Sequence, residues 1–136
     1  MKKLICRPKI WITIPEQGKH YSVDLNMHVY REGGEVAPSF ELMCAAIDGD
    51  IQSAEGSGST ALQDIEWIES GQVDSIDADG NAWIAHIRPD KVWFEGLYNQ
   101  GEGGEVSFEQ YKLAVQTYVR FLADPQRLSI EVPFPD

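Results

Sequence analysis

The chain has 136 residues, 43% of them apolar, and a formal net charge of −11. This is long and apolar enough to bury a core, which excludes a disordered protein. The acidity argues against attraction to nucleic acid or to an anionic membrane, because like charges repel. The sequence contains no apolar run of about 20 residues, the length a membrane span needs. We therefore expect a single domain over residues 1–136, without nucleic-acid or membrane partners.

The negative charge is concentrated in the middle of the chain. Residues 1–31 contain six basic and two acidic residues, residues 32–110 contain two and 17, and residues 111–136 contain three of each. At the N-terminus, basic residues interrupt MKKLICRPKIWITI before a signal peptide's apolar stretch forms. We expect an unexported, cytoplasmic protein, in which Cys6 and Cys44 remain buried free thiols.

The N-terminal part of the chain predicts strands. KIWITI (9–14) and YSVDLNMHVY (21–30) alternate between apolar and polar residues, which is typical of half-buried strands, and PEQGK (15–19) connects them as a hairpin. SFELMCAAI (39–47) fits either a strand or a short helix. The Asp-Gly pair that follows favours a strand, because this pair is a strong hairpin-turn signal. DIQSAEG (50–56) would then return as a polar edge strand.

A helix and a meander are expected next. Thr60 or Ser59 would cap a helix in which Leu62, Ile65 and Ile68 share one face, with Gly71 at C′. The three segments that follow predict a three-stranded meander, because residues suited to tight turns separate them: QVDSIDAD (72–79), NAWIAHIR (81–88) and KVWFEGLYN (91–99).

The C-terminal third contains the clearest helix. NQGEGGEV (99–106) is expected to be a glycine-rich loop, after which Ser107 caps SFEQYKLAVQTYVRFLAD. Apolar residues then fall on one helical face: Phe108, Tyr111, Val115, Tyr118 and Leu122. RLSIEVPF (127–134) is a last strand. The order predicts an α+β fold, with a largely antiparallel sheet of about six to eight strands and two helices packed on one face.

No motif with a defined chemistry is present. Asp77, Asp79 and Gly80 fit positions 3, 5 and 6 of an EF-hand loop, but position 12 is His86 in place of the bidentate acid, so a hairpin turn is the better reading. The histidines lack zinc-motif spacing, and no GxSxG sequence is present. The sequence therefore predicts no metal, no cofactor and no catalytic residues.

What stands out is the acidic stretch DIEWIESGQVDSIDADGN (64–81), which has six carboxylates and no lysine or arginine. An acidic surface steers basic partners inward. Trp67 either widens the buried helix face or stands exposed as an anchor, a role in which tryptophan is favoured at interfaces. The candidate partner-binding residues are Asp64, Glu66, Trp67, Glu69, Asp74, Asp77 and Asp79, with Glu102 and Glu105 at the rim.

The chain has a small size, an acidic composition, a strand-rich N-terminal half and a late helix, SFEQYKLAVQTYVRFLAD, before a last strand. In these features it resembles bacterial immunity proteins of the contact-dependent or polymorphic-toxin type. The resemblance covers the whole chain in outline. It implies a cytosolic, non-catalytic protein that binds one cognate toxin and blocks its active site. Many such toxins are basic nucleases. An acidic surface can compete with nucleic acid for the binding site of such a nuclease.

Two other functions stay open. A small-ligand-binding or regulatory module would hold its ligand on the sheet face or in a helix–sheet crevice, lined by Trp83, Trp93 and Tyr98. A carboxylate-based hydrolase would need two acids with perturbed pKa values in a concave site. With 22 acids in the chain, the sequence favours no particular pair.

Overall fold

The computed structural model describes residues 1–8, 11–14, 19–22 and 25–136, and the side chains of residues 1–8 and 25–136. The strands in these residues are β1 (Lys2–Cys6), β2 (Trp11–Ile14), β3 (Lys19–Ser22), β4 (Met27–Tyr30), β5 (Ile76–Asp79), β6 (Trp83–Ile87), β7 (Lys91–Gly96), β8 (Glu102–Ser107) and β9 (Ile130–Phe134). The α-helices are α1 (Glu41–Asp50), α2 (Ser57–Glu69) and α3 (Phe108–Ala123), and a short 3₁₀ helix precedes α1 at Pro38–Phe40. The expected α+β class with antiparallel strands is confirmed.

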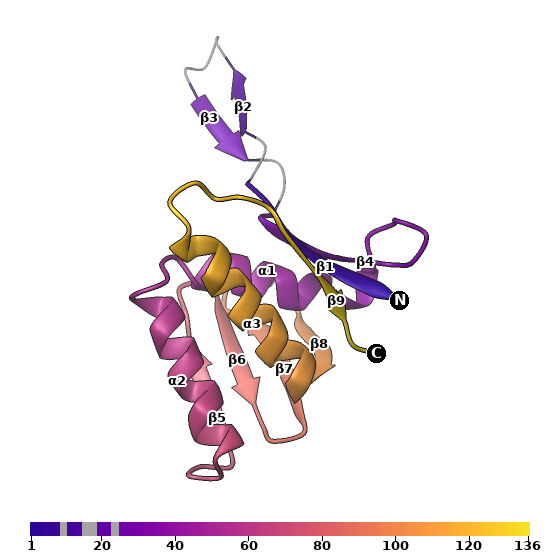
Figure 1. The fold of residues 1–136 in the computed structure, drawn as a ribbon. Helices are drawn as coiled ribbons and strands as arrows, with labels where there is room; N and C mark the ends of the chain where they lie inside the picture. Colours follow the sequence, from indigo (N-terminus) through magenta and orange to yellow (C-terminus); the bar gives the residue numbers. More distant parts are fainter. Residues whose placement is uncertain (9–10, 15–18, 23–24) are drawn as a thin grey trace.

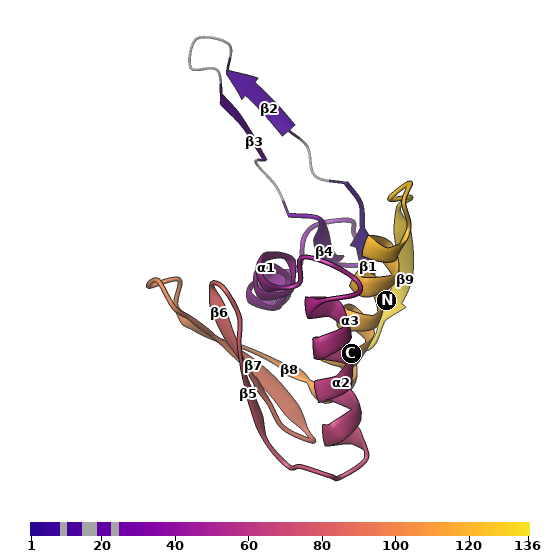
Figure 2. The same cartoon turned by 90° about the vertical axis from the view of Figure 1, so that its left-hand side faces the viewer.

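The strands divide into separate sheets instead of forming one. The first sheet has the order β4-β1-β9, so the N-terminal strand lies between its neighbours, with Leu4 opposite both Val29 and Val132. Strands β2 and β3 pair as an antiparallel hairpin that projects away from the rest of the molecule (Figures 1 and 2). The second sheet is the meander β5-β6-β7-β8.

Helices α1 and α3 lie between these two larger sheets (Figure 2). Helix α1 contacts β4 on one side and β6, β7 and β8 on the other; α3 contacts β1 and β9 on one side and β7 and β8 on the other. Helix α2 packs beside α3 (Figure 1). The core therefore has a helical layer in its middle. Among the described residues, helices cover the inner face of the second sheet and not its outer face, which carries polar side chains.

The expected C-terminal helix and the meander are confirmed. Ser107 and Gln110 form a capping box: the Ser107 hydroxyl accepts the Gln110 N–H at 3.0 Å, and the Gln110 side chain accepts the Ser107 N–H at 2.9 Å. Gly71 follows the end of α2 with φ +80°, as expected of a C′ glycine. Helix α2 begins at Ser57, slightly earlier than predicted.

The strand predicted over residues 39–47 is wrong, because Glu41–Asp50 form helix α1. Met43, Cys44, Ala46 and Ile47 are all buried, since the helix has a sheet on either side. A helix that is apolar on several faces has a pattern that periodicity cannot distinguish from a buried strand. The return strand over residues 50–56 is wrong for the same reason: this segment completes α1 and connects it to α2.

Two further boundaries differ from the prediction. The glycine-rich segment 99–106 contains strand β8 from Glu102 onward, and the strand predicted over residues 21–30 is divided between β3 and β4. Strand β1 was not predicted. Residues 9–10, 15–18 and 23–24, which include most of the PEQGK connection, lie outside the described residues.

Both cysteines are buried and free, as expected. Burial raises the pKa of the Cys6 thiol to about 12, and it raises the pKa of the Cys44 thiol as well, so both stay protonated and unreactive at neutral pH. None of the helices in the described part of the chain has the length and apolar character needed to span a bilayer.

Candidate functional site

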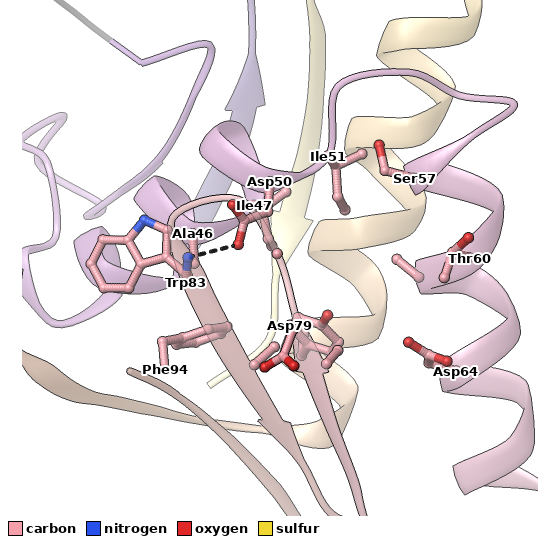
Figure 3. Close-up of a pocket in the computed structure, with 15 residues that line it drawn as sticks. Ala46, Ile47, Asp50, Ile51, Ser57, Thr60, Asp64, Asp79, Trp83 and Phe94 are labelled. Carbon is pink, nitrogen blue, oxygen red and sulfur yellow. Dashed lines mark hydrogen bonds between the residues drawn. The ribbon is translucent and has the colours of Figure 1, made fainter. Parts of the chain in front are cut away.

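A crevice of about 200 Å³ opens where α1, α2 and the β5–β6 hairpin meet (Figure 3). Most of its lining is apolar, contributed by Ala46, Ile47, Ile51, Ala61, Ala78, Trp83, Ala85 and Phe94. Three acidic residues, Asp50, Asp64 and Asp79, and two hydroxyl residues, Ser57 and Thr60, also line it. The crevice thus combines an apolar surface with negative charge.

Asp50 links helix α1 to the β5–β6 turn at this crevice. Its carboxylate accepts the backbone N–H groups of Ala82, at 2.9 Å, and Trp83, at 3.1 Å, which fastens the β5–β6 turn to the end of α1 (Figure 3). The approach is close: a Cβ added to Gly80 would lie 2.0 Å from the Asp50 Oδ2 atom. Asp50 therefore shapes the crevice, and its charge is already partly satisfied.

Asp64 and Asp79 differ from Asp50, because neither side chain has a hydrogen bond or ion pair with another described residue. Asp64 lies on α2 and is partly buried, and this burial raises the pKa of its carboxyl. Burial also raises the pKa of the Tyr111 hydroxyl, and the charges of Asp64 and Asp50 raise it further. Asp64 therefore lies at the crevice without a cationic neighbour among the described residues, whereas Asp79 is exposed, on the same face of β5 as Asp77, and lies at the edge of the crevice.

The outer side of α2 carries the next predicted residues. Trp67 is 42% exposed, which places it at the surface rather than in the core. It lies three residues after Asp64, so both are on neighbouring parts of the same helix surface. Glu66 and Asp74 are exposed, and Glu69 is ion-paired with Lys112.

The remaining predicted acids lie on the outer face of the second sheet. Asp77 accepts hydrogen bonds from His86 and Arg88, which lower the pKa of its carboxyl. Burial alone would lower the pKa of His86, but its hydrogen bonds with Asp77 and Glu95 outweigh burial and raise it. Glu105 lies 3.7 Å from Lys91.

The structure does not bring the nine predicted residues onto one surface. Asp64 and Asp79 share the crevice, and Trp67 is close to it on α2. Glu102 and Glu105 are on β8, and neither lines the crevice. Glu102 lies opposite Glu95 on the outer face of the sheet, so these two acids are not the rim of the crevice.

The aromatic residues expected to line a ligand site are also dispersed. Trp83 lines the crevice, Trp93 pairs with His86 on the opposite face of the sheet, and Tyr98 is 72% exposed in the β7–β8 connection. The sequence analysis missed Asp50, His86 and Glu95. The β6–β7 register carries a signal for the last two, because the predicted Pro89-Asp90 turn places His86 opposite Trp93, with Glu95 two residues further along on the same face.

No protein-family model matches the sequence, and comparison with curated proteins and with solved structures gives no significant match. The functional argument therefore rests on the chemistry of the crevice and of the surfaces around it.

Proposed function

We propose that this chain is a non-catalytic binding protein that neutralises a basic protein toxin, a nuclease being the best fit, in the cytoplasm. The observation that supports this most is Asp64, a partly buried carboxylate that lines an apolar crevice without a cationic partner among the described residues, with the exposed Asp79 at the edge of the crevice. A partner that supplied a cation there would compensate a charge that the fold leaves uncompensated.

The crevice suits one basic side chain. Lysine and arginine have long apolar stems and charged ends, so the stem can contact Ala78, Ile51 and Phe94 while the charge meets the carboxylates. The volume, about 200 Å³, is below the roughly 300–1,000 Å³ typical of sites for drug-sized ligands. A single inserted side chain fits this space better than a large cofactor does.

Trp67 is the proposed anchor beside the crevice. A tryptophan that is 42% exposed can bury a large apolar area when a partner covers it, and such residues often dominate binding energy. Glu66 and Asp74 would contribute mainly to association rate and orientation, because exposed charges steer partners more than they hold them.

A small cationic ligand, such as an amine with a short apolar body, is the second candidate. The same crevice favours it, since carboxylates and apolar lining occur together there. A ligand of this class would bind without Trp67, whereas a protein partner would cover it.

The test first identifies the toxin, by sequencing the neighbouring genes and by a pull-down from the native strain. The chain is then co-expressed with that toxin domain, and binding is measured by calorimetry on the purified pair. We expect Asp64→Asn with Asp79→Asn to weaken binding at least about tenfold and to reduce the protection of cells, because the charge in the crevice and the charge at its edge are both lost. The matched control is Glu32→Gln with Glu35→Gln, which removes the same charge from a loop beside the first sheet.

The control should bind as the wild type does. Equal losses of affinity in the two double variants would contradict a specific role of the crevice. They would show that the toxin is attracted by the whole acidic surface. Full protection by the Asp64/Asp79 variant would show that the crevice is not the toxin-binding site.

A further inference from the structure

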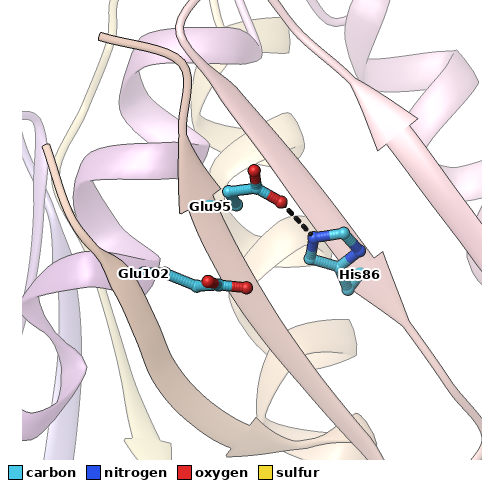
Figure 4. A group of neighbouring side chains, drawn as sticks. All are labelled: His86, Glu95 and Glu102. Atoms are coloured by element: carbon cyan, nitrogen blue, oxygen red, sulfur yellow. Dashed lines mark hydrogen bonds and ion pairs between the residues drawn. The ribbon is translucent and has the colours of Figure 1, made fainter. Parts of the chain in front are cut away.

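Three potential metal ligands converge on the outer face of the second sheet, away from the helices (Figure 4). His86 comes from β6, Glu95 from β7 and Glu102 from β8, and one ligand atom of each lies within 4.8 Å of the other two. Glu95 is directly opposite Glu102, and it is the diagonal neighbour of His86 across the β6–β7 pair. We propose that these three side chains bind a first-row divalent transition-metal ion.

His86 is held in the orientation that a metal ligand requires. Its Nδ1 atom is 2.8 Å from Asp77 Oδ1, Asp77 is in turn 3.0 Å from Arg88, and the imidazole stacks on Trp93 at 5.0 Å. Metal-binding histidines commonly donate one ring N–H to a carboxylate in this way, which directs the other nitrogen toward the metal. Here the other nitrogen, Nε2, points at Glu95.

The gap between Nε2 and Glu95 Oε1 is 3.0 Å. Glu95 can only accept here, so without a metal Nε2 carries a proton that it donates to Glu95; a metal ion that takes the place of this proton would be bound by the same two atoms. Two atoms that each bind one ion at about 2.1 Å, at adjacent positions, lie about 3.0–3.4 Å apart. The observed spacing therefore matches neighbouring ligands of one metal ion.

The third ligand, Glu102, is exposed and has no ion pair or hydrogen bond with another residue in the described part of the chain. The nearby cations are already engaged: Arg88 with Asp77, and Lys91 with Glu105 at 3.7 Å. Glu102 is thus available to complete the site with a small side-chain movement.

The ligand set selects the class of ion. One imidazole and two carboxylates suit Zn²⁺, Mn²⁺, Fe²⁺, Co²⁺ or Ni²⁺, whereas Ca²⁺ and Mg²⁺ prefer oxygen ligands alone. Three protein ligands leave further positions for water. The site shares no residue with the crevice on the other face of the sheet, so it is independent of the proposed function.

The experiment is calorimetric titration of the EDTA-treated, dialysed protein with Zn²⁺, and separately with Ca²⁺ and Mg²⁺. We expect saturable Zn²⁺ binding at one site that involves His86, and much weaker Ca²⁺ and Mg²⁺ binding. Glu102→Gln should weaken Zn²⁺ binding at least about tenfold. Glu105→Gln is the matched control, because it changes an equally exposed acid of the same strand outside the ligand set, and it should have no effect.

Asp77→Asn tests the positioning of His86. It leaves all three ligands in place but should weaken Zn²⁺ binding about ten- to hundredfold. NMR of the His86 ring provides a direct readout, because Zn²⁺ on Nε2 should shift that nitrogen and keep the proton on Nδ1. Thermal unfolding without metal confirms that each variant is folded.

Three results would overturn the proposal: equal Zn²⁺ affinity in the Glu102 and Glu105 variants, Ca²⁺ or Mg²⁺ binding as tight as that of Zn²⁺, or His86 ring signals that do not respond to saturating Zn²⁺. The first two would indicate diffuse attraction of cations to an acidic surface. The third would indicate binding at other histidines or at the N-terminus.

Discussion

At the scale of single residues, Asp64 is kept in an environment that disfavours its charge. Burial raises the pKa of its carboxyl above that in the unfolded chain, so the folded state binds the proton more tightly. Its contribution to stability is therefore favourable at low pH and is lost as the pH rises through the interval between the unfolded and the folded pKa.

We expect Asp64→Asn to be more stable than the wild type at pH 7, by about 0.5 kcal/mol or less, because substitutions near the surface have effects of this size. The advantage should disappear below about pH 3, where Asp64 is protonated in both the folded and the unfolded wild type. Urea unfolding of both proteins at the two pH values measures this difference in the free energy of unfolding. A variant less stable than the wild type at pH 7 would mean that Asp64 has a stabilising partner.

At the scale of elements, strand β8 depends on glycine. The β7–β8 pairing shifts register between Val92 and Phe94, and Gly104, in the bulge, has φ +65°. The strand also approaches α1 closely there, since a Cβ on Gly104 would lie 2.6 Å from Leu42 Cβ. The glycines that predict a loop in the sequence are thus the residues that let this strand bend and pack.

We expect Gly104→Ala to cost about 2–3 kcal/mol, of which about 1 kcal/mol is backbone strain and the rest is the clash with Leu42. Gly71→Ala is the matched control, because φ there is +80° and no atom lies within 4 Å of the added Cβ. Urea unfolding of both variants separates the two contributions. Equal losses would show that the contact with Leu42 relaxes without cost.

At the scale of the whole molecule, one hydroxyl joins the helical layer to the first sheet. The Tyr118 hydroxyl of α3 donates to Asp48 of α1 at 3.1 Å and accepts from Asn26, just before β4, at 3.0 Å. Asp48 also accepts the Asn26 backbone N–H at 3.2 Å. Tyr118 is almost completely buried, its hydrogen bond with Asp48 is buried, and its bond with Asn26 is partly buried.

We expect Tyr118→Phe to lower the free energy of unfolding by about 1–3 kcal/mol, because buried polar groups lose a partner while the packing volume is kept. Tyr98→Phe, at a hydroxyl that is largely exposed, should change stability little. Chemical denaturation compares the free energies of unfolding of the two variants with that of the wild type. If both variants unfold alike, the three-element network contributes nothing to stability.

The parts of the fold that could be predicted are those with local signals. Ser107 and Gln110 cap α3 with each other, Gly71 ends α2, and the Asp79-Gly80 turn joins two strands; each of these depends on residues a few positions apart. In the site, the sequence identified Asp64, Trp67 and Asp79 as candidates, but it placed Glu102 and Glu105 beside them. The distance across the sheet depends on strand order, which composition does not encode.

By itself, the sequence determined the α+β class, the C-terminal helix, the meander and the concentration of acids in the middle of the chain, because caps, turns and alternation act locally. Only the tertiary structure decided that residues 41–50 are a helix, since sheets on both sides of it bury side chains on several of its faces. It also brought Asp64 to Asp79 and gathered His86, Glu95 and Glu102, because pairing between strands and packing between layers join residues that the chain keeps apart.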